Sequence, residues 1–164
     1  MKTIYLIAIV VATIVVVGIG VVFGVGSVLS AEEITVRHGT KSGAILLNLR
    51  NSGFLADCLI GADVYGVTKD GKRRDMETEL HDMVMEGGVM KMRRVDKICV
   101  EPLSTVRMRG TATDGEHVMI FGDVHGIDHY VVLLKFQSGK TLSFRAEAPT
   151  TMGEELYEHE HEHE

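Results

Sequence analysis

Histidine and methionine occur close together in two segments of this chain. The first segment begins at His81, and the second consists of His117 and, two residues later, Met119. The first segment also contains a row of four methionines: Met83, Met85, Met90 and Met92. Thioether sulfur and imidazole nitrogen together suit a soft cation, above all Cu(I). The two segments therefore predict a binding site for a copper ion.

The first segment is expected to fold as a β-hairpin around Gly87-Gly88, because a type I′ turn needs positive φ at both central residues. With these glycines at the turn, Met85 lies opposite Met90 and Met83 lies opposite Met92. Cross-strand partners share a face of the hairpin, and so do residues two apart. One face therefore carries all the possible ligands of this segment: His81, Met83, Met85, Met90 and Met92.

His81 is diagonal to Met92 in this register, within reach of a shared ion. His117 and Met119 also point to one side of a strand, so as neighbours of the hairpin both could face that ion. The opposite face of the hairpin places Asp82 across from Arg93, as a solvent-facing charge pair.

A methionine-rich strand face is also a common way to fill a core. For Met85 and Met90, next to the turn, packing or a flexible rim is the favoured interpretation, and for Met83 the two interpretations are balanced. The repeated combination of histidine with methionine two residues later has no explanation in core packing. We therefore treat Met83, Met85 and Met90 as possible accessory ligands only.

The elements that must position these residues are expected to be β-strands. Between residues 32 and 149, apolar and β-branched runs alternate with turn signals, and no segment shows a helical period. Many short strands at this spacing indicate an all-β sandwich or barrel. The predicted strands are Ile34–His38, Ala44–Leu49, Asp57–Tyr65, Glu79–Met85, Val89–Val95, Thr105–Met108, Glu116–Phe121, Tyr130–Phe136 and Thr141–Ala146.

The first 31 residues form a different unit. From Ile4 to Leu29 no residue is charged, and about 20 apolar residues suffice to span a bilayer. We predict an uncleaved transmembrane helix, with a cleaved signal peptide ending near Val28–Ala31 as the alternative. Lys2 is the only basic residue before the run, which favours the N-terminus inside and the domain on the periplasmic or cell-surface side.

Residues 150–164 form a polar, low-complexity tail that is predicted to be disordered. Of the 23 acidic residues, six lie in this tail, so 17 acidic residues balance 17 basic ones in the rest of the chain. This balance and the scarcity of aromatic residues argue against a nucleic-acid partner. The tail alternates glutamate with His159, His161 and His163, which suits a copper-collecting segment, an engineered affinity tag or a merely solvated end.

Cys58 and Cys99 lie 41 residues apart in apolar runs. Buried free thiols are the favoured interpretation, and a disulfide is the alternative outside the cell. Neither cysteine is followed closely by histidine, which argues against a blue-copper site. The segment from Asp123 to His129 also clusters possible ligands, but a polar loop is the better interpretation. No residue has the setting of a nucleophile or general base, so we do not expect an enzyme.

The stretch from His81 to Arg93 closely resembles the hairpin of the PCuAC family of periplasmic copper chaperones, which serve the Cu-A centre of cytochrome c oxidase. The family hallmark is a histidine, ten residues, a methionine, about twenty-one residues and then His-x-Met. His81 and Met92 match the first spacing, and His117-Val118-Met119 resembles the closing element. The second gap has twenty-four residues here, and we place its extra length in the loop Gly110–Gly115.

The resemblance covers roughly residues 44–148 and implies a cupredoxin-like β-sandwich. It implies that His81, Met92, His117 and Met119 hold Cu(I). It also implies delivery of that copper by ligand exchange to an acceptor cuproprotein such as the Cu-A subunit. The expected function is therefore a membrane-anchored, extracytoplasmic copper chaperone. The alternatives are a copper store or resistance protein without a dedicated acceptor, and a metal-free interaction domain whose methionine face contacts a partner.

Overall fold

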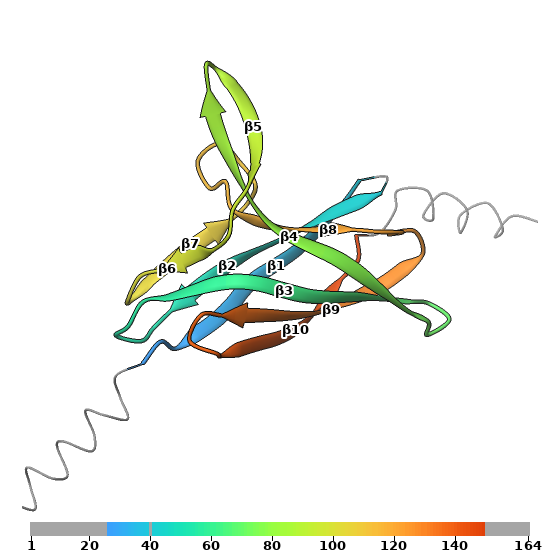
Figure 1. The fold of residues 1–164 in the computed structure, drawn as a ribbon. Helices are drawn as coiled ribbons and strands as arrows, with labels where there is room; N and C mark the ends of the chain where they lie inside the picture. The colour runs from blue at the N-terminus through green and yellow to red at the C-terminus, as the bar shows by residue number, and fades with distance from the viewer. Residues whose placement is uncertain (1–25, 40, 150–164) are drawn as a thin grey trace, which may run out of the picture.

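The computed structural model describes residues 26–39 and 41–149, and in this part of the chain the structure consists of strands, turns and loops without a helix (Figure 1). The all-β class predicted from the sequence is confirmed. The ten strands are β1 (Leu29–His38), β2 (Ser42–Asn51), β3 (Asp57–Thr68), β4 (Arg73–Glu86), β5 (Val89–Arg94), β6 (Ile98–Val100), β7 (Ser104–Met108), β8 (His117–Phe121), β9 (Ile127–Phe136) and β10 (Thr141–Glu147).

Nine of these strands overlap the predicted ones, and β6 was missed because three residues are too few to show an alternating pattern. Strand β1 begins at Leu29, five residues before the predicted start of that strand. The two acidic residues that hid its beginning lie at an irregularity, where the register shifts between Glu32 and Thr35. Glu33 has a φ of 51° at this point. The irregularity breaks the apolar alternation that a sequence pattern needs.

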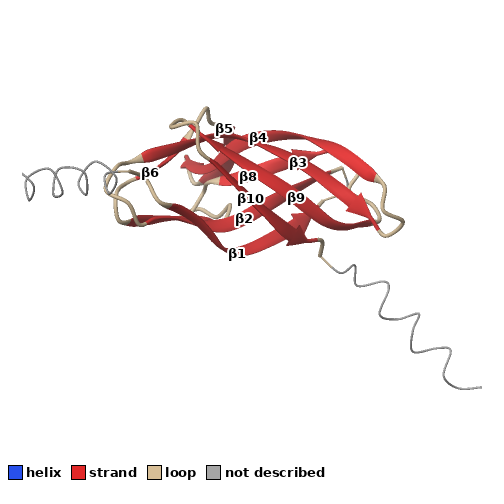
Figure 2. Cartoon of the chain, turned by 90° about the horizontal axis from the view of Figure 1, so that it is seen from below, coloured by secondary structure: helices blue, strands red, loops and turns tan. Residues whose placement is uncertain are grey.

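The strands pair antiparallel in the order β1-β2-β8-β4-β3-β9-β10, with β5 on β4, β6 on β3 and β7 on β2. The two end strands of this order, β1 and β10, also contact each other, so the sheet curls around a single core (Figure 2). Burial of apolar side chains inside the curled sheet is the main force that stabilises this fold. The largest fully buried apolar residues are Tyr130, Ile45, Leu47, Leu49, Leu59, Met108, Ile120 and Leu134.

Strand β4 connects the body of the domain to the predicted hairpin. Its first residues pair with β3, Glu77–His81 pair with β8, and His81–Glu86 pair with β5. As a result the β4–β5 hairpin stands off the curled sheet (Figure 1). The observed pairs Met83 with Met92 and Met85 with Met90 confirm the register predicted from Gly87-Gly88.

Residues 1–25 of the predicted membrane anchor and residues 150–164 of the predicted tail, with His159, His161 and His163, lie outside the described residues. Within the described residues no helix is long and apolar enough to cross a membrane. The last residues of the apolar run belong to the domain, since Ser27 is buried and Leu29 starts β1.

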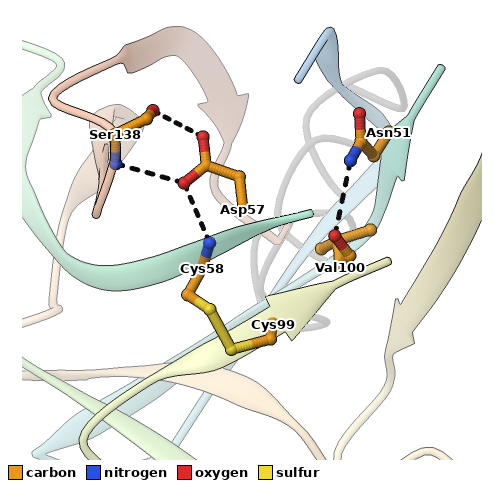
Figure 3. Close-up of a disulfide and its surroundings, with 6 residues drawn as sticks. All are labelled: Asn51, Asp57, Cys58, Cys99, Val100 and Ser138. Carbon is orange, nitrogen blue, oxygen red and sulfur yellow. Dashed lines mark hydrogen bonds between the residues drawn. A yellow bond between two sulfur atoms is a disulfide. The ribbon is translucent and has the colours of Figure 1, made fainter. Parts of the chain in front are cut away.

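The two cysteines are joined, so the favoured prediction of free thiols is wrong. Cys58 on β3 and Cys99 on β6 are directly opposite each other in the sheet and form a disulfide (Figure 3). Their apolar neighbours Leu59, Ile98 and Val100 alternate with them and point into the core. The cysteines therefore lie on the outer face of the pair, where Cys99 is exposed to solvent.

Candidate metal-binding site

The two histidines of the predicted site are brought next to each other by the pairing of β4 with β8. His81 is directly opposite His117 in this register, and their ring centroids are 5.9 Å apart. Both side chains are buried although both are polar. Buried polar groups are expected to have partners, so the partners of each ring nitrogen decide what the pair can do.

His117 is held by the loop that precedes β8. Its Nδ1 is 2.8 Å from the carbonyl oxygen of Gly115. A carbonyl only accepts, so Nδ1 carries the proton and Nε2 carries the lone pair that a metal ion requires. Burial, assisted by the neighbouring His81, lowers the pKa of His117 below its ordinary value. The neutral ring, which is the ligand form, is therefore favoured.

His81 is held through its other ring nitrogen, Nε2. Its Nε2 lies 2.8 Å from a carboxylate oxygen of Glu79, whose other oxygen is 2.8 Å from a guanidinium nitrogen of Arg94. The carboxylate accepts the Nε2 proton, which leaves the lone pair on Nδ1. That Nδ1 is buried and has no hydrogen-bond partner. An unsatisfied buried polar atom costs about 1–3 kcal/mol, and a bound cation at Nδ1 would remove this penalty.

The methionines share the sheet face of these histidines. Met119 is opposite Glu79, two residues from His81 on β4, and directly opposite residues in an antiparallel pair share a face. Met92 is opposite Met83 on the hairpin and is diagonal to His81. The two differ in exposure, since Met92 is 51% exposed and Met119 only 9%. The site therefore has a buried floor formed by β8 and an open rim formed by β5.

The remaining methionines extend the same face outward. Met85 and Met90 are opposite each other next to the turn and both are exposed, while Met83 is half-buried. For Met85 and Met90 the prediction is packing or a flexible rim, and their exposure excludes core packing and agrees with the rim.

The loop before β8 is part of the site. The backbone N–H of Met83 donates to the carbonyl of Gly115 across 3.2 Å, so the loop ties the hairpin to the start of β8. A Cβ atom at Gly115 would overlap the side chain of Asp82 and lie only 2.6 Å from the carbonyl oxygen of Met83. The segment to which the sequence assigned the extra residues therefore orients His117 directly.

Two details of the site differ from the sequence prediction or were absent from it. Asp82 is opposite Arg93 as predicted. However, Arg93 forms its ion pair with Glu86, which lies on the same face of the hairpin. Glu79, which fixes the proton position of His81, was missed. Its signal was its position two residues before His81, which puts both side chains on one face of a strand.

In the described part of the chain, no three or more His, Cys, Asp or Glu side chains gather in a way that could hold a metal ion. The histidine pair alone is too small a set for a hard or borderline metal, so a site here depends on thioether sulfur. Of the segment from Asp123 to His129, only residues 123–126 form the predicted loop between β8 and β9, and Ile127–His129 begin β9. Arg74 binds the Asp123 carboxylate at 2.9 Å and the His125 carbonyl at 2.7 Å.

The fold and this face define an all-β domain in which a His/Met face lies between β8 and a protruding hairpin. The chain belongs to the LpqE-like family, whose model, described as "Putative lipoprotein LpqE-like", matches residues 27–148. No curated protein matches it.

Among solved structures, the apo PCuAC domain from PmoF1 is similar at 15% identity, covering 77% of this chain and 97% of that one, with a TM-score of 0.54. This likeness confirms the PCuAC fold implied by the resemblance. The copper-bound PCuAC domain from PmoF2 is 21% identical, with 76% and 99% of the two chains covered and a TM-score of 0.49. The apo PmoF2 PCuAC domain is 22% identical, with 77% and 97% covered and a TM-score of 0.47.

Proposed function

We propose that this domain binds one Cu(I) ion between β4, β5 and β8. The observation that carries the proposal is the pair of opposed, buried histidines, in which His81 has a partnerless Nδ1 and His117 has its Nε2 lone pair free of the Gly115 contact. In this site His81 would bind through Nδ1 and His117 through Nε2. Met119 would bind from the floor and Met92 from the rim.

Two imidazoles and two thioethers form a neutral, soft ligand set that prefers Cu(I) to hard divalent ions. Both histidines have their second nitrogen anchored by a protein acceptor, an arrangement that fixes the orientation of metal-binding imidazoles. The protein contributes this orientation and the shielding from water, while the bound copper is the cargo.

The difference in burial between Met119 and Met92 suits a chaperone. A partner protein can reach Met92 on the exposed strand β5 and replace it, while the buried ligands keep the ion in place until the next exchange. The proposed acceptor is an extracytoplasmic cuproprotein, for example the Cu-A subunit of cytochrome c oxidase. Transfer from the loaded protein to a purified Cu-A domain tests delivery, and full retention by this protein would contradict it.

We place the domain outside the cytoplasm, attached to the membrane by the apolar run from Ile4. The disulfide between Cys58 and Cys99 supports this location, because disulfides persist in oxidising compartments. The family description, which names a lipoprotein, also supports a location outside the cytoplasm. Both cysteines are engaged in the disulfide, so neither has a thiol for lipid attachment, and the apolar run is the proposed anchor.

Copper binding is tested by a competitive Cu(I) titration against a chromophoric chelator, with the chain trimmed to residues 26–149. We expect one tight equivalent, which is lost in His81→Ala and weakened in Met92→Leu. His125→Gln and Met108→Leu are matched controls, since His125 is exposed in a distant loop and Met108 is buried in the core. Equal affinity in the site and control variants would contradict the proposed site.

A copper store is the second candidate, supported by the opposed Met85 and Met90 on the exposed hairpin. A store would bind several ions by using this pair, Met83 and the histidines of the tail. The full chain and the trimmed chain distinguish the two functions: one equivalent in both supports delivery, and several equivalents in the full chain support storage, held by the hairpin if they persist in the trimmed chain and by the tail if they do not.

A further inference from the structure

A second exposed apolar region lies at the end of the domain where the chain enters β1. It consists of Val28, Phe54, Leu55 and Leu103, which we call the end patch. Val28 is 58% exposed, Phe54 64% and Leu103 66%. Exposed apolar clusters on a small domain mark contact surfaces, and the copper site does not involve this one.

Backbone hydrogen bonds hold the three segments of the end patch together. The N–H of Phe54 donates to the carbonyl of Gly26 across 3.0 Å, and the N–H of Leu103 donates to the carbonyl of Gly53 across 3.2 Å. A Cβ atom at Gly53 would overlap the backbone of residues 26–28. The loop between β2 and β3 therefore touches the incoming chain at its backbone.

Asn51 is the buried centre of this arrangement. It is fully buried, and its Oδ1 accepts from the N–H groups of Val28 and Gly53 at 3.1 and 3.0 Å. Its Nδ2 donates to the carbonyls of Leu55, at 2.8 Å, and Val100, at 3.4 Å; Figure 3 shows the latter. One polar side chain thus fixes the backbone beneath the patch while the apolar side chains point outward.

Leu103 also has an unfavourable backbone conformation, with a φ of 54°. For a leucine, the left-handed region is unfavourable, because the Cβ atom comes too close to the following carbonyl oxygen. An exposed leucine in this conformation contributes no core packing in return. Local strain of this kind is typical of residues that serve a contact.

We propose that the end patch rests in the interface of the lipid bilayer that the preceding apolar run enters. The inference depends on the proposed membrane anchor. The apolar run extends from Ile4 to Leu29, and its described end, at Gly26, is hydrogen-bonded to Phe54 of the patch. If residues before Gly26 span the membrane, the patch lies at the membrane surface, because no linker separates Gly26 from it.

The charged side chain of Lys140, next to the place where the apolar run meets the domain, suits a lipid surface. Lys140, in the turn just before β10, donates from Nζ to the hydroxyl oxygen of Ser27 at 3.0 Å and also contacts the Ser27 carbonyl. A lysine beside an emerging apolar segment can reach the lipid phosphates while its stem lies along the apolar surface. Glu101, in the loop that carries Leu103, must then remain at headgroup level.

Docking of the end patch on the bilayer also determines the direction in which the copper site faces. The β4–β5 hairpin leaves the sheet in a different direction from the end where β6 and the start of β1 lie, as Figure 1 shows. The bilayer contact therefore leaves the open rim of the site accessible to an acceptor protein.

The chain contains no tryptophan, so a single introduced tryptophan reports on its own surroundings. We would reconstitute the full chain in vesicles of phosphatidylcholine and phosphatidylglycerol with brominated acyl chains. The reporters are Phe54→Trp in the end patch and Val89→Trp, a matched exposed apolar position on the hairpin. Flotation with the vesicles is measured in parallel and tests the anchor separately.

We expect both variants to float and bromine to quench Phe54→Trp several-fold more than Val89→Trp. Adding Leu103→Asn to the Phe54→Trp chain is expected to reduce that quenching while thermal unfolding shows a domain that is still folded. Flotation with equal quenching of the two reporters would overturn the docking, keep the anchor and assign the patch to a protein partner. Failure to float would overturn both.

Discussion

The two exposed apolar regions of this domain differ in chemistry and in support. The hairpin region carries thioethers, which are flexible and can donate to a metal, and it stands off the sheet on two strands. The end patch carries hydrocarbon and aromatic side chains, which cannot bind metal, and its backbone is fixed by the buried Asn51. Exposed methionine beside buried histidine indicates a ligand set, whereas exposed leucine and phenylalanine on a fixed backbone indicate a contact surface.

The disulfide joins β3 to β6, and β6 lies in the chain between the hairpin strand β5 and the patch residue Leu103. Replacing both Cys58 and Cys99 with alanine is expected to lower the free energy of unfolding by about 4 kcal/mol, from the chain entropy of a loop of this length. Cu(I) affinity should stay unchanged, because neither cysteine is a proposed ligand. Urea unfolding and the chelator titration measure the two effects. Loss of copper binding in a folded variant would show that the disulfide supports the site itself.

Asn51 is expected to matter only for the end patch and for stability. Asn51→Ala leaves the N–H groups of Val28 and Gly53 and the carbonyl groups of Leu55 and Val100 without this partner, so we expect a loss of roughly 3 kcal/mol in unfolding free energy. Asn48→Ala is the control, since its side chain accepts one bond from Arg109, and it should cost about 1 kcal/mol. Similar losses in the two variants in urea unfolding would mean that Asn51 is not the centre of the patch.

Glu79 is expected to affect only the copper site. Glu79→Ala removes the acceptor of the His81 Nε2 proton, and such outer contacts are worth about 10–100-fold in metal affinity. Glu79→Gln keeps an acceptor oxygen and should recover part of the loss. The matched control is Glu77→Gln, an exposed glutamate two residues earlier on β4.

Two measurements test the role of Glu79. The Cu(I) titration gives the affinity, and nitrogen NMR of the apo domain reports which ring nitrogen of His81 carries the proton. A proton on Nε2 in the wild type and a mixture of tautomers in Glu79→Ala is the expected result. An unchanged tautomer in Glu79→Ala would contradict a positioning role.

The smallest effect on the free energy of unfolding is expected at Leu103, where the substitution should stabilise the domain. Leu103→Asn should raise the free energy of unfolding by about 0.5–1 kcal/mol, because asparagine tolerates positive φ better than leucine. Leu55→Asn makes a similar chemical change at an exposed position of the same patch, and its φ is not positive. It should leave the stability nearly unchanged in thermal unfolding. A loss of stability in Leu103→Asn would show that the leucine packs on the domain.

Local signals in the sequence were sufficient for the hairpin. Gly87-Gly88 fixed the turn, and the turn fixed which methionines are opposite each other. The opposition of His81 and His117 depends on the pairing of β4 with β8, between segments 36 residues apart, which no local pattern encodes. The resemblance to PCuAC proteins named these residues as ligands, but it did not give their geometry or the role of Glu79.

Apolar runs alone do not predict the disulfide. The apolar neighbours of Cys58 and Cys99 suggest buried thiols, but strand alternation puts such neighbours on the opposite face. Recognising this required strand β6, which is too short to predict. The end patch was missed for a related reason, since its members come from three loops that meet only in the folded chain.

The central claim is a copper site of two imidazoles and two thioethers on the face shared by β4, β5 and β8. X-ray absorption spectroscopy of the Cu(I)-loaded domain, residues 26–149, tests it most directly. The account predicts nitrogen and sulfur scatterers in equal number, with sulfur reduced in both Met92→Leu and Met119→Leu and unchanged in Met108→Leu. A spectrum with only nitrogen or oxygen neighbours, or one that neither methionine substitution alters, would contradict it.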